Sequence, residues 1–162
     1  KVLGNVFAGF GYRYANVFKL KSDTLGPLYQ SKYYGHQGAE ISGVQFAITS
    51  DYRDNIYYAA KGHYLRLKTS YHFKEIGSNY EFHLIETELR KYFKVFRNKW
   101  DVIAFQIIGY FAQGHAPWSE LGALGSSDIM RGYYSGRYRD KNYIAAQVEY
   151  RLVFNKLLGM VF

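Results

Sequence analysis

Hydrophobic and polar residues alternate without a break near the end of the chain, over Asp140–Phe154. One side of this stretch carries the apolar set Ile144, Ala146, Val148, Tyr150, Leu152 and Phe154. The other side carries the more polar set Tyr143, Ala145, Gln147, Glu149 and Arg151. A period of two sustained over this length predicts a β-strand with one apolar and one polar face.

The same period recurs along the chain and predicts about seven strands. They are Val2–Leu20, Glu40–Tyr52, His63–Lys74, Asn79–Phe96, Trp100–Gln113, Asp140–Phe154 and Leu157–Phe162. Most of these stretches are far longer than the usual globular strand of about 5 to 6 residues. Strands of this length suit a tilted crossing of a lipid bilayer. We therefore predict an antiparallel transmembrane sheet.

Two of the predicted strands depart from a clean alternation. Trp100–Gln113 is apolar on both sides. In Asn79–Phe96, the apolar Phe82 and Leu84 share a side with the charged residues Glu86, Glu88 and Arg90. The pattern therefore predicts a β-bulge or a change of environment near Leu84.

The predicted connections differ in length. Short turns are expected at Ile76–Asn79 and Asn98–Lys99, and long loops at Lys21–Gly38 and Gly114–Arg139. Short turns on one side of a membrane and long loops on the other are typical of transmembrane barrels. On this hypothesis the residues facing lipid are Leu65, Leu67, Tyr71, Phe73, Ile144, Val148 and Leu152. The residues facing the lumen are Arg66, Lys68, His72, Gln147, Glu149 and Arg151.

The composition supports a β-rich chain, with 18 tyrosines, 12 phenylalanines and no cysteine among 162 residues. Aromatic residues suit pleated sheets, and the absence of cysteine excludes disulfides and thiolate metal sites. The net charge of +8 is spread along the chain instead of gathered in one patch, so we expect no nucleic-acid partner. A soluble β-rich binding module remains an alternative on these patterns alone.

The chain carries no pattern typical of an enzyme. Neither a P-loop nor the G-x-S-x-G nucleophile motif occurs, and the five histidines lack helical metal-ligand spacing. His72 and His83 are the one pair that a hairpin would bring together. We expect no catalytic residue, no cofactor and no metal site.

Two stretches resemble one family. Asp51-Tyr-Arg53-Asp54-Asn55, with Lys61-Gly62 following, is similar to the D-x-R-D segment of BamA/TamA-type outer-membrane barrels. Met130-Arg131-Gly132-Tyr133 resembles the (V/I)-R-G-(F/Y) motif of the same family, in a long loop before a strand that ends Glu149-Tyr150-Arg151. The order and spacing of both stretches agree with the family pattern.

The resemblance implies an all-β fold, an antiparallel transmembrane β-barrel of sixteen strands. The chain then supplies about seven consecutive strands, a fragment whose single domain spans residues 1–162. The loop 114–139 would fold into the lumen. Arg131, Gly132 and Tyr133 would form its functional motif, with Glu149 as luminal partner, and Asp51, Arg53 and Asp54 would have a structural role in the wall.

The resemblance also implies a function and a location. Family members act in the bacterial outer membrane, in assembly or insertion of outer-membrane proteins or in polypeptide translocation. The implied partners are the lipid bilayer with its lipopolysaccharide, unfolded outer-membrane protein clients and accessory assembly proteins. The alternative is a passive barrel, either a porin-like channel or the membrane anchor of a fused surface or effector protein.

Arg131 is the residue on which the loop hypothesis depends. Without the resemblance, it reads as an ordinary solvated arginine beside a turn glycine. With it, we expect the guanidinium to point inward and to form a bidentate pair with the Glu149 carboxylate.

Overall fold

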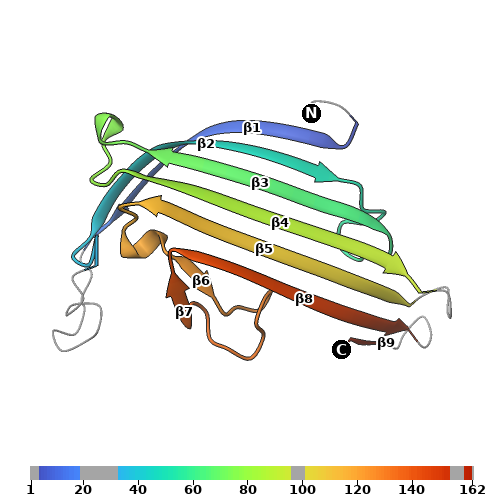
Figure 1. Cartoon of the computed structure of the whole chain (residues 1–162). Coiled ribbons are helices and arrows are strands. Elements are labelled where there is room, and N and C mark those ends of the chain that lie inside the picture. Colours follow the sequence, from blue (N-terminus) through green and yellow to red (C-terminus); the bar gives the residue numbers. More distant parts are fainter. Residues whose placement is uncertain (1–3, 19–32, 96–100, 154–158, 162) are drawn as a thin grey trace.

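The computed structural model describes residues 4–18, 33–95, 101–153 and 159–161. Seven strands form one antiparallel sheet in the order β1-β2-β3-β4-β5-β8-β9. Their bounds are Val6–Val17 (β1), Ala39–Asp51 (β2), Gly62–His72 (β3), Phe82–Lys94 (β4), Val102–Gly114 (β5), Asn142–Val153 (β8) and Gly159–Val161 (β9). Figure 1 shows the long strands lying side by side as one open, tilted sheet. The predicted all-β antiparallel fold is confirmed.

The connections contain little regular structure. The described residues include two short 3₁₀ helices, η1 at Lys74–Ile76 and η2 at Trp118–Glu120. Within the loop between β5 and β8, Gly122–Leu124 (β6) pairs with Tyr138–Asp140 (β7) as a small hairpin. No helix among the described residues is long and apolar enough to cross a bilayer.

Strand β4 keeps an unbroken register with both neighbours, from Phe82 to Tyr92 with β3 and from Phe82 to Lys94 with β5. No bulge is present, so the change of environment is the correct alternative. Phe82 and Leu84 lie on the same face as Glu88, and they are buried there in an apolar cluster. The other buried members of this cluster are Ala39, Ile41, Ala112 and Ala116. One face of β4 is therefore apolar at one end and charged in the middle.

The expected division of turns and loops between the two ends of the sheet is wrong in one respect. In a meander of antiparallel strands, every second connection lies at the same end. The β3–β4 turn around Ile76 therefore lies at the same end of the sheet as the β5–β8 loop and the start of β2, as Figure 1 shows. The backbone N–H of Asn79 bonds to the carbonyl of Glu40 at this end. Asn98–Lys99 and most of Lys21–Gly38 lie outside the described residues.

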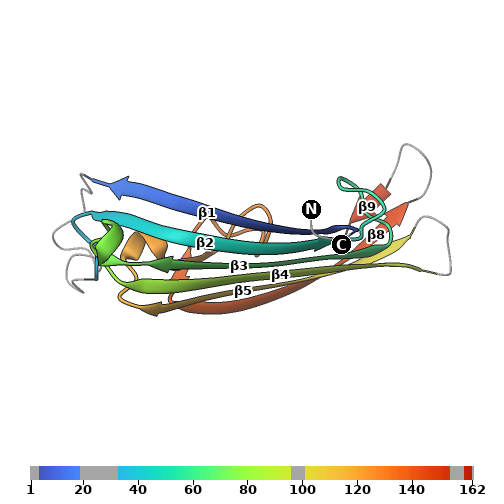
Figure 2. The same cartoon turned by 90° about the horizontal axis from the view of Figure 1, so that it is seen from above.

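The sheet is curved, and its two faces differ in chemistry. Figure 2 shows β1 rising on one side of the curve, with the loop that carries β6 and β7 on the concave side. The concave face carries Arg66, Lys68, His72, Gln147, Glu149 and Arg151, as the alternation predicts. The convex face carries the exposed apolar residues Leu65, Leu67, Tyr71, Ile144 and Val148.

The convex surface is apolar well beyond these residues. Further large side chains exposed on it are Phe10, Phe46, Leu89, Phe93, Phe105 and Ile107. A soluble protein rarely exposes a continuous apolar surface of this extent. The sheet therefore has an apolar exterior and a concave face that carries the charged residues.

His72 and His83 lie on opposite faces, although their strands pair. His72 is buried on the concave face and stacks on Phe82 with ring centroids 4.1 Å apart. His83 lies on the convex face, where Nε2 is 2.6 Å from the hydroxyl of Thr69. The suggestion that the two histidines approach each other is wrong, because directly opposed residues are Tyr71–His83 and His72–Phe82.

Candidate luminal anchor site

Two glutamates organise the charges of the concave face. Glu88 on β4 accepts from Arg90 at 2.6 Å and pairs with Arg66 of β3 at 3.1 Å. Its side chain is 6% exposed, so both guanidinium groups offset the cost of burying a carboxylate. The second glutamate, Glu149 on β8, is likewise shared by two arginines.

A chain of amide side chains joins Glu88 to the long loop. Gln106 of β5 donates to Glu88 Oε1 at 2.9 Å. Gln147 of β8 donates to Gln106 Oε1 at 2.6 Å and to the backbone carbonyl of Asp128 at 2.9 Å. Three neighbouring strands and the loop are thus linked by one hydrogen-bonded network, in which each buried polar group has a partner.

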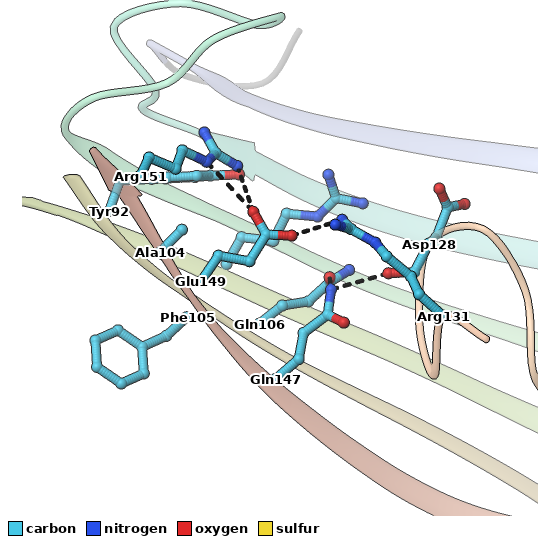
Figure 3. Close-up of a pocket in the computed structure, with 10 residues that line it drawn as sticks. Tyr92, Ala104, Phe105, Gln106, Asp128, Arg131, Gln147, Glu149 and Arg151 are labelled. Atoms are coloured by element: carbon cyan, nitrogen blue, oxygen red, sulfur yellow. Dashed lines mark hydrogen bonds and ion pairs between the residues drawn. The ribbon is translucent and has the colours of Figure 1, made fainter. Parts of the chain in front are cut away.

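Arg131 reaches from the loop to the wall, and we name its contact with Glu149 the tip anchor. Arg131 Nη2 lies 2.6 Å from Glu149 Oε1, and Arg131 Nε donates to the carbonyl of Ser127 at 3.1 Å. Arg151 holds the other carboxylate oxygen, Oε2, at 3.1 Å (Figure 3). The contact is therefore end-on, and the expected bidentate geometry is wrong because the second oxygen is taken.

The backbone of the loop turns sharply beside Arg131. Met130 and Gly132 both have positive φ angles, of 53° and 101°. This conformation is strained for Met130 and easy for Gly132, which explains the glycine at this position of the motif. Tyr133 stands half exposed, its ring edge-on to Tyr138 at 5.6 Å.

The first motif stretch forms a compact turn between β2 and β3. Arg53 donates to both carboxylate oxygens of Asp51, at 2.8 and 2.6 Å, and stacks over Tyr64 at 4.7 Å. Asp54 Oδ1 accepts the backbone N–H groups of Ala60 and Lys61. Burial acts to raise the pKa of Asp54, but these two donors, together with the backbone N–H groups of Asp54 itself and Asn55, outweigh it and lower the pKa below its ordinary value.

The turn between β2 and β3 folds onto the concave face and contacts the tip anchor. Ala59 is buried in an apolar cluster with Tyr92, Val102 and Ala104. Arg151 Nη1 donates to the carbonyl of Ala59 at 3.4 Å while its Nη2 holds Glu149. The two motif stretches, far apart in sequence, are therefore joined through Arg151 and Glu149.

A second attachment of the loop, which we name the root anchor, lies close to its start. Glu120 at the end of η2 makes a bidentate pair with Arg13 of β1, at 2.7 and 2.8 Å. The carbonyl of Glu120 accepts from the hydroxyl of Tyr110 on β5 at 2.6 Å. The sequence patterns did not single out this pair. Arg13 on the polar side of a predicted strand was the only signal, and nothing in the sequence points from it to Glu120.

The space beneath the tip anchor is polar and small. A pocket of about 160 Å³ lies between the loop and β5 and β8, lined by Arg90, Gln106, Asp128, Arg131, Gln147, Glu149 and Arg151, among others. Each carboxylate named in the two anchors is paired with arginine, and the described residues contain no cluster of metal-ligating side chains. The ion pairs of the two anchors can hold the loop against the wall of strands, and they can break and re-form with other partners.

The curved sheet, its apolar exterior and its inward-folded loop define the class of protein. It is an open sheet of the kind that forms part of a transmembrane-type β-barrel, with a loop held on its concave face. A family model described as the Omp85 superfamily domain matches residues 5–162, and the chain belongs to this superfamily. The match confirms, at the level of the superfamily, the resemblance seen in the two motifs. No curated protein matches the chain.

Some properties are general to the Omp85 superfamily. Omp85 superfamily domains are characteristic of bacterial outer-membrane proteins, and their members in general are non-enzymatic insertases or transporters with protein clients. The roles expected for Asp51, Arg53, Asp54, Arg131, Gly132, Tyr133 and Glu149 remain predictions, although the distances above are consistent with them.

Proposed function

We propose that the chain forms part of the wall and the inward loop of an outer-membrane barrel. This barrel inserts outer-membrane proteins or translocates polypeptides. In this proposal the whole of residues 1–162 belongs to one partial barrel domain. The loop 114–139 is its internal constriction. The chemistry is non-covalent and requires no cofactor.

The observation that carries the proposal is the pair of anchors on the loop. A loop that only connected two strands would have no need of ion pairs to β1 and to β8 at the same time. Held at both points, the loop occupies the concave side, where a polypeptide would pass or a client strand would be guided. Its attachments are hydrogen bonds and ion pairs, which can break and re-form without covalent change.

The convex face supports placement in a bilayer. Its strands present apolar side chains over about the height of a hydrocarbon core. Lysine or arginine at the bilayer midplane on a lipid-facing position of a barrel costs about 2 to 4 kcal/mol. Reversing the two faces would expose Arg66, Lys68 and Arg90 to lipid together, which no sheet could tolerate.

The proposal is tested by assembly in a reconstituted bilayer. The full-length protein is placed in liposomes with its accessory proteins, and folding of an unfolded barrel client is followed by its heat-modifiable migration. We expect client folding to exceed that of empty liposomes, and Glu149→Ala to reduce it severalfold. Lys74→Ala, which removes an exposed charge at the start of η1, serves as the matched control.

A passive barrel predicts another outcome. If the full-length protein conducts ions steadily, folds or exports no client, and is unaffected by Glu149→Ala, the proposal is wrong. Exchange of the upstream region would then show whether the barrel serves as an anchor.

A further inference from the structure

Two arginines of the loop differ from all others that the structure describes. Arg13, Arg53, Arg66, Arg90, Arg131 and Arg151 each pair with a carboxylate. Arg137 and Arg139 have no carboxylate partner among the described residues, and both are exposed. Because the other described arginines are neutralised by carboxylates, the two that are not are candidates for binding an anionic group.

Aromatic rings hold the two arginines instead. Arg139 lies over the ring of Trp118, 4.4 Å from its centroid. Arg137 donates to the hydroxyl of Tyr134 at 2.7 Å and lies 5.4 Å from the centroid of that ring. Such contacts orient a guanidinium without neutralising it, so the forked donors stay available to an anionic group.

The two arginines line one pocket beside an unpaired strand edge. Arg137, Tyr138 and Arg139 line a pocket of about 390 Å³, together with Gly122, Leu124, Asp140 and Tyr143. Strand β7 pairs with β6 on one side only, and all three of its residues are exposed. Arg139 is the middle residue of β7, and Arg137 directly precedes the strand and donates its backbone N–H to the carbonyl of Tyr134.

We propose that Arg137 and Arg139 form a binding site for an extended acidic polypeptide segment that pairs with the free edge of β7. Alternate side chains of an extended peptide project on one side about 6 to 7 Å apart, so carboxylates at positions i and i+2 would reach the two guanidinium groups that line this pocket. The edge of β7 would supply backbone hydrogen bonds, which a lipid or a sugar phosphate cannot match. This proposal rests on the proposed handling of polypeptides and names the kind of segment recognised.

The test uses the full-length protein in nanodiscs and fluorescence anisotropy. The probe is a short labelled peptide with Glu at alternate positions and Thr between them. Its isomer, with the same composition but contiguous glutamates, is the control peptide. We expect the alternating peptide to bind more tightly, and Arg137→Gln and Arg139→Gln each to weaken it about tenfold, as for the loss of a charge-assisted hydrogen bond.

A charge-matched variant separates specific from general attraction. Lys61→Gln with Lys74→Gln removes two exposed positive charges outside the pocket and should leave binding unchanged. Equal binding of both peptides, equal weakening by the lysine variant, or no effect of the arginine variants would each overturn the proposal. Displacement of the peptide by phosphatidylglycerol vesicles, dependent on the two arginines, would instead assign the site to a phospholipid.

The outcome does not depend on assembly activity. A protein that folds clients but does not bind the alternating peptide contradicts this inference alone. A protein that binds the peptide through Arg137 and Arg139 but handles no client contradicts the proposed function alone.

Discussion

The root and the tip of the loop are both attached by arginine–glutamate pairs, yet the two attachments differ. At the root, the side chains of Arg13 and Glu120 are 35% and 9% exposed, and both oxygens of Glu120 bind Arg13. At the tip, the side chains of Arg131 and Glu149 are 58% and 16% exposed, and Arg131 meets one oxygen of Glu149. A shielded bidentate pair is strong, whereas an exposed end-on pair contributes little. The root therefore fixes the loop, and the tip is the part that can be released.

Glu149 has a second arginine, and this also separates the two anchors. When Arg131 leaves, Arg151 still neutralises the carboxylate. Among the described residues, Glu120 makes its salt bridge with Arg13 alone. Releasing the tip therefore costs little free energy, whereas releasing the root would leave a buried charge without a partner.

The largest effect is expected from breaking the root. Arg13→Ala leaves the Glu120 carboxylate unpaired and shielded, a change that costs on the order of 3 kcal/mol. The loop should become sensitive to limited proteolysis, and the unfolding midpoint of the full-length protein in detergent should fall. Lys74→Ala should change neither, and an Arg13→Ala protein as stable and as resistant as wild type would contradict the role of the root.

A smaller effect is expected from crowding the root without touching its charges. A Cβ atom at Gly122 would lie 2.6 Å from the ring of Tyr110 and 2.7 Å from that of Tyr143. Gly122→Ala should therefore destabilise the full-length protein by about 1 to 3 kcal/mol in denaturant titrations. Gly9→Ala is the matched control, because nothing lies within 4 Å of a Cβ there. Equal stability of the two variants would show that the packing beneath η2 is loose.

At the tip, the two partners should not be equivalent. Arg131→Ala removes one exposed contact and should cost less than about 1 kcal/mol. Glu149→Ala leaves both Arg131 and Arg151 without their carboxylate and should cost about 2 kcal/mol. Limited proteolysis of the loop and denaturant unfolding measure both. If Arg131→Ala proves the more harmful, Arg131 has a partner more important than Glu149.

The smallest expected effect is a dependence on pH at the β2–β3 turn. Asp54 has an ordinary pKa of 3.8, and its pKa in the folded chain is lowered. Its contribution is therefore complete above about pH 4 and is lost as the pH falls through the folded pKa. Protection of the Ala60 and Lys61 amides against hydrogen exchange should fall in that range. Asp54→Asn should remove this dependence, and a variant that keeps it would contradict the assignment.

The strands could be predicted because their two faces meet different surroundings, and this difference imposes a period of two on the sequence. β8 alternates throughout, and its bounds of Asn142–Val153 lie within the predicted Asp140–Phe154. β5 is apolar on both sides for a reason that the alternation alone could not reveal. Its concave side is covered by Ala59 of the β2–β3 turn at one end and by the Leu84 cluster at the other.

The contacts of the loop were only partly predictable. The motif around Arg131 and the polar side of β8 suggested the pairing with Glu149. The root could not be foreseen, because Arg13 and Glu120 are 107 residues apart and meet only through the curvature of the sheet. Strands β6 and β7 have three residues each, too few to show any period.

The central claim is that the tip of the loop lies against the concave face of β8. The chain has no cysteine, so a pair can be introduced at will. Met130 and Ala145 line the same pocket, and substituting both leaves every ion pair of the two anchors intact. We expect Met130→Cys with Ala145→Cys to be joined by a short bismaleimide in intact membranes. Met130→Cys with Ile144→Cys, one residue away on the convex face, should not be joined. Equal crosslinking of the two pairs, or none at Ala145, would contradict the account.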